Sequence, residues 1–118
     1  MDSLNQLFIV LSERLVKDFN HTVAKHGGRG RLFRGYGLTE VASVCTVNNY
    51  KDVREDSIGK PLTGMTVEIW DEMKNKLPAG KTGEIVITGE TVMQGYFNGD
   101  ETEPDDGVYV DKNGTRWV

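Results

Sequence analysis

Fourteen glycines in 118 residues are the feature that most limits what this chain can fold into. Glycine weakens helices and accepts the backbone angles of tight turns, so glycines spread from residue 27 to residue 114 favour short strands and turns over a helix bundle. A hydrophobic content of 37% and a charged content of 27% are typical of an ordinary folded domain, and this length suffices to bury one core. We therefore expect one small, turn-rich domain.

One amphipathic helix is predicted near the N-terminus, over Glu13–Lys25. Ser12 stands at the N-cap position, apolar residues recur at helical spacing, and a glycine pair follows the last turn. The apolar run Leu7–Leu11 predicts a buried strand before the helix, and Arg31–Phe33 predicts a short strand after it. Residues 1–42 are thus expected to form a strand–helix–strand unit with parallel strands.

Residues 43–118 are predicted to form a second, mainly antiparallel β unit. Strand patterns occur at residues 41–47 (after one helical turn at most), 65–70, 84–88 and 92–93. The second and third of these are expected to pair, and residues 58–62 suggest a glycine–proline bend. Asn113-Gly114 favours a hairpin between residues 108–110 and 116–118. The predicted class is α+β, with a distorted β-barrel-like second part.

Composition excludes several kinds of function. A net charge of −4 and a pI near 5.1 give no electrostatic reason to expect a nucleic-acid partner. Cys45, the single cysteine, cannot form an internal disulfide and suits a core position better than a nucleophile's. His21 and His26 are five residues apart, so they do not share a helix face as a metal pair would. No apolar run is long enough to span a membrane, and a cytoplasmic protein is expected.

The stretch Arg34–Glu40 (RGYGLTE) carries the most chemistry. Tyr36, between two glycines, offers a flat face that can stack on a purine ring. The Thr39 hydroxyl can bond a phosphate oxygen, and the neighbouring Glu40 carboxylate can hold a hard cation such as Mg²⁺. The same residues also suit an ordinary glycine-broken turn with a buried tyrosine. On the residues alone, both interpretations stay open.

Residues 35–40 (GYGLTE) resemble the YGxTE motif of the adenylate-forming enzyme superfamily, which includes acyl-CoA synthetases, nonribosomal peptide adenylation domains and luciferases. Further matches follow in the family's order: SIGKPLTG at 57–64 resembles SxGxPxxG, LPAGKTGEIVI at 77–87 resembles PxGxxGE[IL], and GETVMQGYFN at 89–98 resembles GxxVMxGYxN. Ser12–Leu15 occupies the place of a Gly-Gly-[AE]-x-Leu turn, although Leu11-Ser12 replaces the usual glycines. The resemblance covers the chain from about residue 7 to residue 118.

Parts of the family's site are not in this sequence. It has no glycine- and Ser/Thr-rich phosphate loop, no Thr-Gly-Asp segment with the ribose-binding aspartate, and no small domain with the catalytic lysine. The resemblance therefore implies a fragment of a large N-terminal domain, completed by the remainder of a parent chain. We expect the fragment to be inactive by itself.

The resemblance implies a role for each matching residue. Tyr36 would stack on adenine, Thr39 would bond the AMP phosphate, and Glu40 would ligate Mg²⁺. Thr39 and Glu40 would form the catalytic pair. The remaining nucleotide-site residues implied are Ser12 and Glu13, at the adenine edge through their backbones, and Gly35 and Gly37, at the junction with the acyl pocket.

The implied reaction is attack of a substrate carboxylate on the ATP α-phosphate, which gives an acyl-adenylate and pyrophosphate. The thiol of coenzyme A or of a carrier pantetheine then takes the acyl group. An acyl-CoA synthetase, with a role in fatty acid metabolism, is favoured because no carrier domain is present. The alternatives are an amino-acid adenylation domain of the nonribosomal peptide type and a non-catalytic β-rich binding module.

Overall fold

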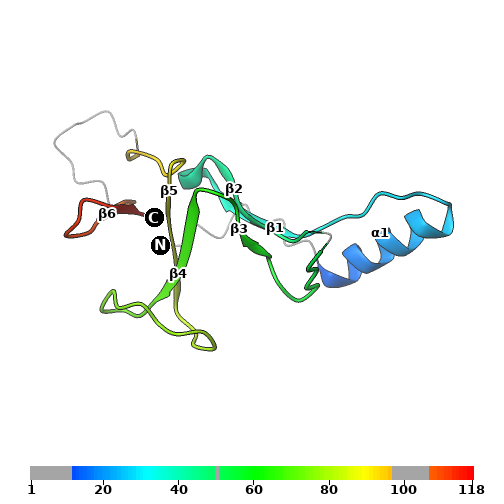
Figure 1. The fold of residues 1–118 in the computed structure, drawn as a ribbon, viewed down its shortest axis with the longest axis horizontal. Coiled ribbons are helices and arrows are strands. Elements are labelled where there is room, and N and C mark those ends of the chain that lie inside the picture. The colour runs from blue at the N-terminus through cyan, green and yellow to red at the C-terminus, as the bar shows by residue number, and fades with distance from the viewer. Residues whose placement is uncertain (1–11, 50, 97–106) are drawn as a thin grey trace.

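The computed structural model describes residues 12–49, 51–96 and 107–118. The molecule is elongated, measuring 57 × 35 × 26 Å, with the helix at one end and a β-hairpin at the other (Figure 1). The predicted strand Leu7–Leu11, and with it the predicted parallel pairing, lies outside the described residues. The described elements are α1 (Glu13–Lys25), β1 (Gly35–Leu38), the 3-10 turn η2 (Thr39–Val41), β2 (Ser43–Val47), β3 (Lys60–Pro61), β4 (Met65–Trp70), β5 (Glu84–Gly89), β6 (Tyr109–Val110) and β7 (Arg116–Trp117).

Helix α1 has the predicted bounds because both of its ends are capped as the sequence indicates. The Ser12 hydroxyl oxygen accepts a hydrogen bond from the Leu15 amide at 3.1 Å, and Gly27 ends the helix with a φ of 76°. Val16 is its buried residue, whereas Phe19 remains 48% exposed. No helix within the described ranges is both long and apolar enough to cross a membrane.

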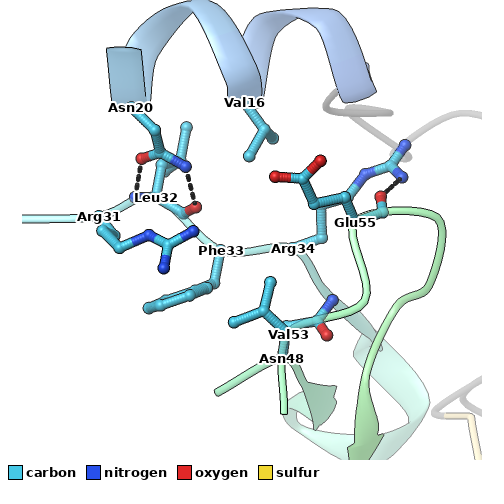
Figure 2. Close-up of a pocket in the computed structure, with 9 residues that line it drawn as sticks. All are labelled: Val16, Asn20, Arg31, Leu32, Phe33, Arg34, Asn48, Val53 and Glu55. Carbon is cyan, nitrogen blue, oxygen red and sulfur yellow. Dashed lines mark hydrogen bonds between the residues drawn. The ribbon is translucent and has the colours of Figure 1, made fainter. Parts of the chain in front are cut away.

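The predicted strand Arg31–Phe33 is wrong, and the side chain of Asn20 explains why. Asn20 on α1 accepts a hydrogen bond from the Leu32 amide at 2.7 Å and donates one to the Leu32 carbonyl at 3.1 Å (Figure 2). Both backbone groups of Leu32 are therefore satisfied without a partner strand. The segment runs beside α1 and becomes a strand only at Gly35.

The described strands form three small antiparallel sheets, ordered β1-β2-β3, β4-β5 and β6-β7. The predicted strand Met65–Trp70 has the predicted bounds, and the predicted 84–88 strand extends by one residue to Gly89. These two strands pair as expected, from Met65 opposite Gly89 to Trp70 opposite Glu84. The helical turn before β2 and the 109–117 hairpin are confirmed as well. No closed barrel forms among the described residues, so the barrel-like arrangement is not confirmed.

Two local predictions in the β-rich part are wrong. Residues 92–93 are not a strand: the Val92 amide donates to the Gly89 carbonyl in a turn, and the Met93 amide donates to the Glu40 carbonyl at 2.8 Å. Residues 60–61, expected in a bend, instead form β3 at the edge of a sheet. Proline is compatible with an edge strand because it needs no partner for an amide hydrogen.

Two apolar clusters hold the sheets together. The first combines Val41, Cys45, Ile87 and Val92, with the partly buried Tyr36, Leu38, Met65, Val67 and Val118 packed against it. The second consists of Trp70, Val86 and Trp117. The ring centroids of the two tryptophans lie 4.9 Å apart. Ile87 and Val118 exchange two backbone hydrogen bonds, at 2.8 and 3.0 Å, which join β5 to the C-terminal hairpin. The core therefore spans elements from residue 36 to residue 118.

In the β1–β2 pair the two backbones approach each other closely at Gly37. A register shift between Tyr36 and Gly37 places Gly37 opposite Val44, and a Cβ atom at Gly37 would lie 1.8 Å from the Ser43 carbonyl oxygen. Any side chain at Gly37 would therefore force the strands apart.

We predict that Gly37→Ala lowers the free energy of unfolding by about 1–3 kcal/mol. The added methyl group would overlap the Ser43 backbone, which cannot move aside as the end of a flexible side chain can. Thermal or denaturant unfolding followed by circular dichroism measures the effect. Gly30→Ala is the matched control, since nothing lies within 4 Å of a Cβ atom at Gly30. Equal stability of the Gly37→Ala variant and the wild type would contradict the strand pairing described above.

The β6–β7 hairpin is organised by the carboxylate of Asp111. It accepts hydrogen bonds from the Trp117 indole at 3.1 Å and from the amides of Thr115 at 3.0 Å and Asn113 at 2.8 Å. These donors, the indole first, hold the pKa of Asp111 below its usual value.

A depressed folded-state pKa makes Asp111 a source of acid sensitivity. Its contribution to stability is fully present above the unfolded-state pKa of about 3.9 and is lost as the pH falls through the lower folded-state pKa. We predict that Asp111→Asn lowers the Tm at neutral pH and flattens the fall of Tm below about pH 4. Thermal unfolding at a series of pH values tests this, with the exposed Asp18→Asn as control. An unchanged acid slope in Asp111→Asn would refute it.

Candidate functional site

The predicted catalytic pair lies on the η2 turn, where the chain leaves β1. Thr39 is exposed, whereas the Glu40 side chain is only 8% exposed. Val41 belongs to the first core cluster and so anchors the turn to the core. Ala42 closes the turn in the left-handed region, with a φ of 60°, and its amide donates to the Thr39 carbonyl at 3.0 Å. This turn presents a hydroxyl and a carboxylate on consecutive residues.

Glu40 is held in place through both its backbone and its side chain. Its carbonyl accepts a hydrogen bond from the Met93 amide at 2.8 Å, and its carboxylate oxygen Oε1 accepts one from the Tyr96 hydroxyl. Both partners come from the segment that follows β5, more than 50 residues along the chain. Sequence reasoning missed Tyr96 as a partner of Glu40. The GYFN match contained this tyrosine, but nothing in one sequence links it to residue 40.

Tyr36 is half-buried and packs against the first core cluster. Burial, followed by the nearby Cys45 and Glu40, raises the pKa of its phenol above the usual value, so the ring stays neutral at physiological pH. Its carbonyl accepts a weak hydrogen bond from the Cys45 Sγ at 3.4 Å. The ring and the η2 turn are therefore joined through one core and keep a fixed relation to each other.

Gly35 and Gly37 have a packing reason to be glycine. A Cβ atom at Gly35 would lie 2.8 Å from the Thr46 carbonyl oxygen, and one at Gly37 would overlap the Ser43 carbonyl. The glycines that flank Tyr36 thus allow β2 to approach β1 closely. A ligand need not be present to require them.

Ser12 and Glu13 lie away from the catalytic pair. Ser12 caps α1, and Lys17 donates a hydrogen bond to the Glu13 carboxylate at 2.6 Å. This hydrogen bond, followed by the positive charge of Lys17, lowers the pKa of Glu13. Glu13 also senses the charge of Arg34, which precedes β1, whereas η2 follows β1. Strand β1 is about 10 Å long at ~3.4 Å per residue. The structure therefore groups Gly35, Tyr36, Gly37, Thr39 and Glu40 and places Ser12 and Glu13 at the opposite end of the strand (Figure 1).

A small pocket lies beside this opposite end, between α1 and the segment that enters β1 (Figure 2). Arg34 and Glu55 both line this pocket, and the Arg34 guanidinium donates a hydrogen bond to the Glu55 carbonyl at 2.7 Å. The pocket has room for about one water molecule, so it is a packing gap rather than a nucleotide site.

Cys45 and His26 have structural positions in the fold. Cys45 is fully buried in the core, as predicted, and burial raises the pKa of its thiol. His26 caps the end of α1, with its Nδ1 at 2.8 Å from the Thr22 carbonyl oxygen. No group of three or more His, Cys, Asp or Glu side chains in the described ranges could hold a metal ion. A metal held by one carboxylate of this chain would need further ligands from elsewhere.

Comparison with known proteins finds similar chains of one family. A long-chain-fatty-acid–CoA ligase of Escherichia coli O6:H1 is 38% identical over 84 residues, covering 70% of this chain and 14% of the ligase. The crystal structure of a long-chain-fatty-acid–CoA ligase from Archaeoglobus fulgidus superposes with a TM-score of 0.73 and 26% identity, over 91% of this chain and 22% of that one.

An adenylation domain of a keto acid-selecting nonribosomal peptide synthetase module has the same fold, with a TM-score of 0.63 at 19% identity over 91% of this chain and 28% of that one. The chain thus spans less than a third of each of these proteins. The family model described as AMP-binding enzyme matches residues 1–97, a range that includes α1, the whole GYGLTE stretch and the Tyr96 contact. The chain therefore belongs to the AMP-binding enzyme family.

Proposed function

We propose that this chain forms part of an ATP-dependent, adenylate-forming acid–thiol ligase. The parent enzyme activates a carboxylate as an acyl-AMP and passes the acyl group to a thiol. The observation that carries the proposal is the η2 corner: Thr39 and Glu40 stand on one core-anchored turn next to Tyr36, within the range that matches the AMP-binding family.

In this proposal each group at the corner has one task. The exposed Thr39 hydroxyl donates to a phosphate oxygen of the nucleotide, and the neutral ring of Tyr36 stacks on adenine. The glycines beside Tyr36 allow β1 to pair closely with β2. Ser12 and Glu13 contribute through backbone groups at the other end of β1.

Glu40 fits Mg²⁺ as a single protein ligand. Mg²⁺ usually keeps several waters and binds one or two carboxylates together with substrate phosphates, so one carboxylate at the phosphate corner is a sufficient contribution from this chain. Mg²⁺ bound there would offset the negative charge of the triphosphate during attack on the α-phosphate. Metal binding is weaker when a ligand is misoriented. The contacts that fix the Glu40 carboxylate therefore favour binding of the metal.

We place the parent enzyme on the acyl-CoA synthetase side of the family, with coenzyme A as the acceptor. Two long-chain-fatty-acid–CoA ligases support this placement, one 38% identical to this chain and one solved structure 26% identical with a TM-score of 0.73. Amino-acid adenylation with a carrier pantetheine as acceptor is the second candidate, and the similarity to bacitracin synthase 3 of Bacillus licheniformis, 39% identical over 83 residues, favours it. We also retain a domain boundary at residues 42/43 and a cytoplasmic location as proposals.

We predict that Glu40→Ala in the full-length parent enzyme lowers ATP–pyrophosphate exchange by at least about 100-fold, because charge stabilisation at the phosphates is lost. The exchange assay is run with a long-chain fatty acid and with a panel of amino acids. Exchange stimulated by the fatty acid supports the acyl-CoA branch, and exchange stimulated by an amino acid supports the second candidate.

Glu90→Ala is the matched control, since Glu90 is exposed in the turn after β5. Wild-type exchange by the Glu40→Ala enzyme would refute the metal role. No exchange by the wild type with any carboxylate would favour a non-catalytic binding module.

We predict that residues 1–118 alone neither adenylate a carboxylate nor bind MgATP tightly. The chain supplies one wall of the proposed site, and charged phosphates need donors on several sides. Isothermal calorimetry with MgATP should give no affinity tighter than about millimolar, the range of a few weak contacts. Micromolar binding would show that the fragment holds a complete nucleotide site.

A further inference from the structure

The hydrogen bond between Tyr96 and Glu40 connects two segments that the proposed mechanism does not yet link. Tyr96 lies 56 residues beyond Glu40, yet its hydroxyl donates to the Oε1 atom of that carboxylate. Tyr96 is 51% exposed, so the contact does not result from burial of the phenol in an apolar core. The phenol thus reaches from a half-exposed position onto a buried carboxylate.

The segment that carries Tyr96 is itself attached to the η2 turn. The Met93 amide donates to the Glu40 carbonyl at 2.8 Å, and Val92 belongs to the same apolar cluster as Val41. Gly107 lies against the Tyr96 ring, where a Cβ atom would come within 2.2 Å of Cε2. The phenol is thus aimed from a segment held on several sides.

We infer that Tyr96 is a positioning residue that orients the Glu40 carboxylate for the nucleotide-bound metal. This inference rests on the proposed function, in which Glu40 ligates Mg²⁺. Tyr96 donates to Oε1 and so restricts rotation of the carboxylate, which would hold the metal through its remaining acceptor positions. Hydrogen-bond donors to a ligating carboxylate set its direction, and their removal typically weakens metal binding or activity by about 10–100-fold.

The first test is Tyr96→Phe in the full-length enzyme that contains this chain. We expect the Mg²⁺ concentration for half-maximal ATP–pyrophosphate exchange to rise about 10-fold, with the KM for the carboxylate unchanged. A second readout does not depend on turnover: binding of Mn²⁺ together with α,β-methylene-ATP, followed by electron paramagnetic resonance, should weaken to the same extent. Tyr109→Phe is the matched control, because Tyr109 lies in the β6–β7 hairpin and contacts Trp70 and Lys74 instead of Glu40.

A double-mutant comparison separates positioning from a general structural role. In a Glu40→Gln background, Tyr96→Phe should have no further effect on Mn²⁺ binding, because the carboxylate that it orients is gone. An equal effect of Tyr96→Phe in both backgrounds would overturn the inference. Unfolding curves of each variant identify any loss that comes from instability, and a Tyr96→Phe enzyme with wild-type metal dependence would also overturn it.

Failure of this inference and failure of the proposed function have different signatures. If Glu40→Ala abolishes exchange while Tyr96→Phe behaves like the wild type, the ligase function stands and the role of Tyr96 is refuted. If Glu40→Ala keeps wild-type exchange and Mn²⁺ binding, the metal role of Glu40 is refuted, and the positioning role is refuted with it.

Discussion

The close approach of β1 and β2 at Gly37 is the constraint on which the position of the η2 turn depends. With no side chain in the way, the Ser43 carbonyl passes next to Gly37, and the chain can reverse within the three residues of η2. That reversal turns Val41 inward to the core and places the Glu40 carboxylate beside the segment after β5. A wider pairing would move Val41 away from the core and the Glu40 carboxylate away from the segment after β5. Backbone packing therefore determines where the carboxylate stands.

The same packing changes how the glycines of the GYGLTE stretch are understood. From the residues alone, glycine beside an aromatic ring suggests close approach of a ligand. In the structure, the space that Gly35 and Gly37 leave is filled by the backbone of β2. The stretch thus combines a structural requirement with a proposed chemical one: the glycines allow the pairing, and the residues that follow them carry the groups that we propose bind phosphate and metal. The cap and ion pair of Ser12 and Glu13 are likewise structural contacts of α1.

Local patterns predicted the parts of the fold that local interactions determine. Helix α1 follows from its Ser12 cap and terminal glycine, and β4 and β5 follow from their alternation. The predicted strand Arg31–Phe33 is wrong because the Asn20 side chain makes the hydrogen bonds that a partner strand would make. The periodicity of the segment does not reveal this contact. At the site, residue types indicated a phosphate and metal corner. The Tyr96 contact could not be predicted, since it depends on how distant segments pack.

Both tryptophans of the chain lie in one cluster, with Trp70 on β4 and Trp117 on β7. Their indoles are therefore optical reporters of a single event, the docking of the C-terminal hairpin on the central sheet. Ultraviolet fluorescence from this chain will describe that docking and will carry little direct signal from the η2 corner. A label for nucleotide or metal studies has to be introduced near η2, because the native chromophores there are tyrosines.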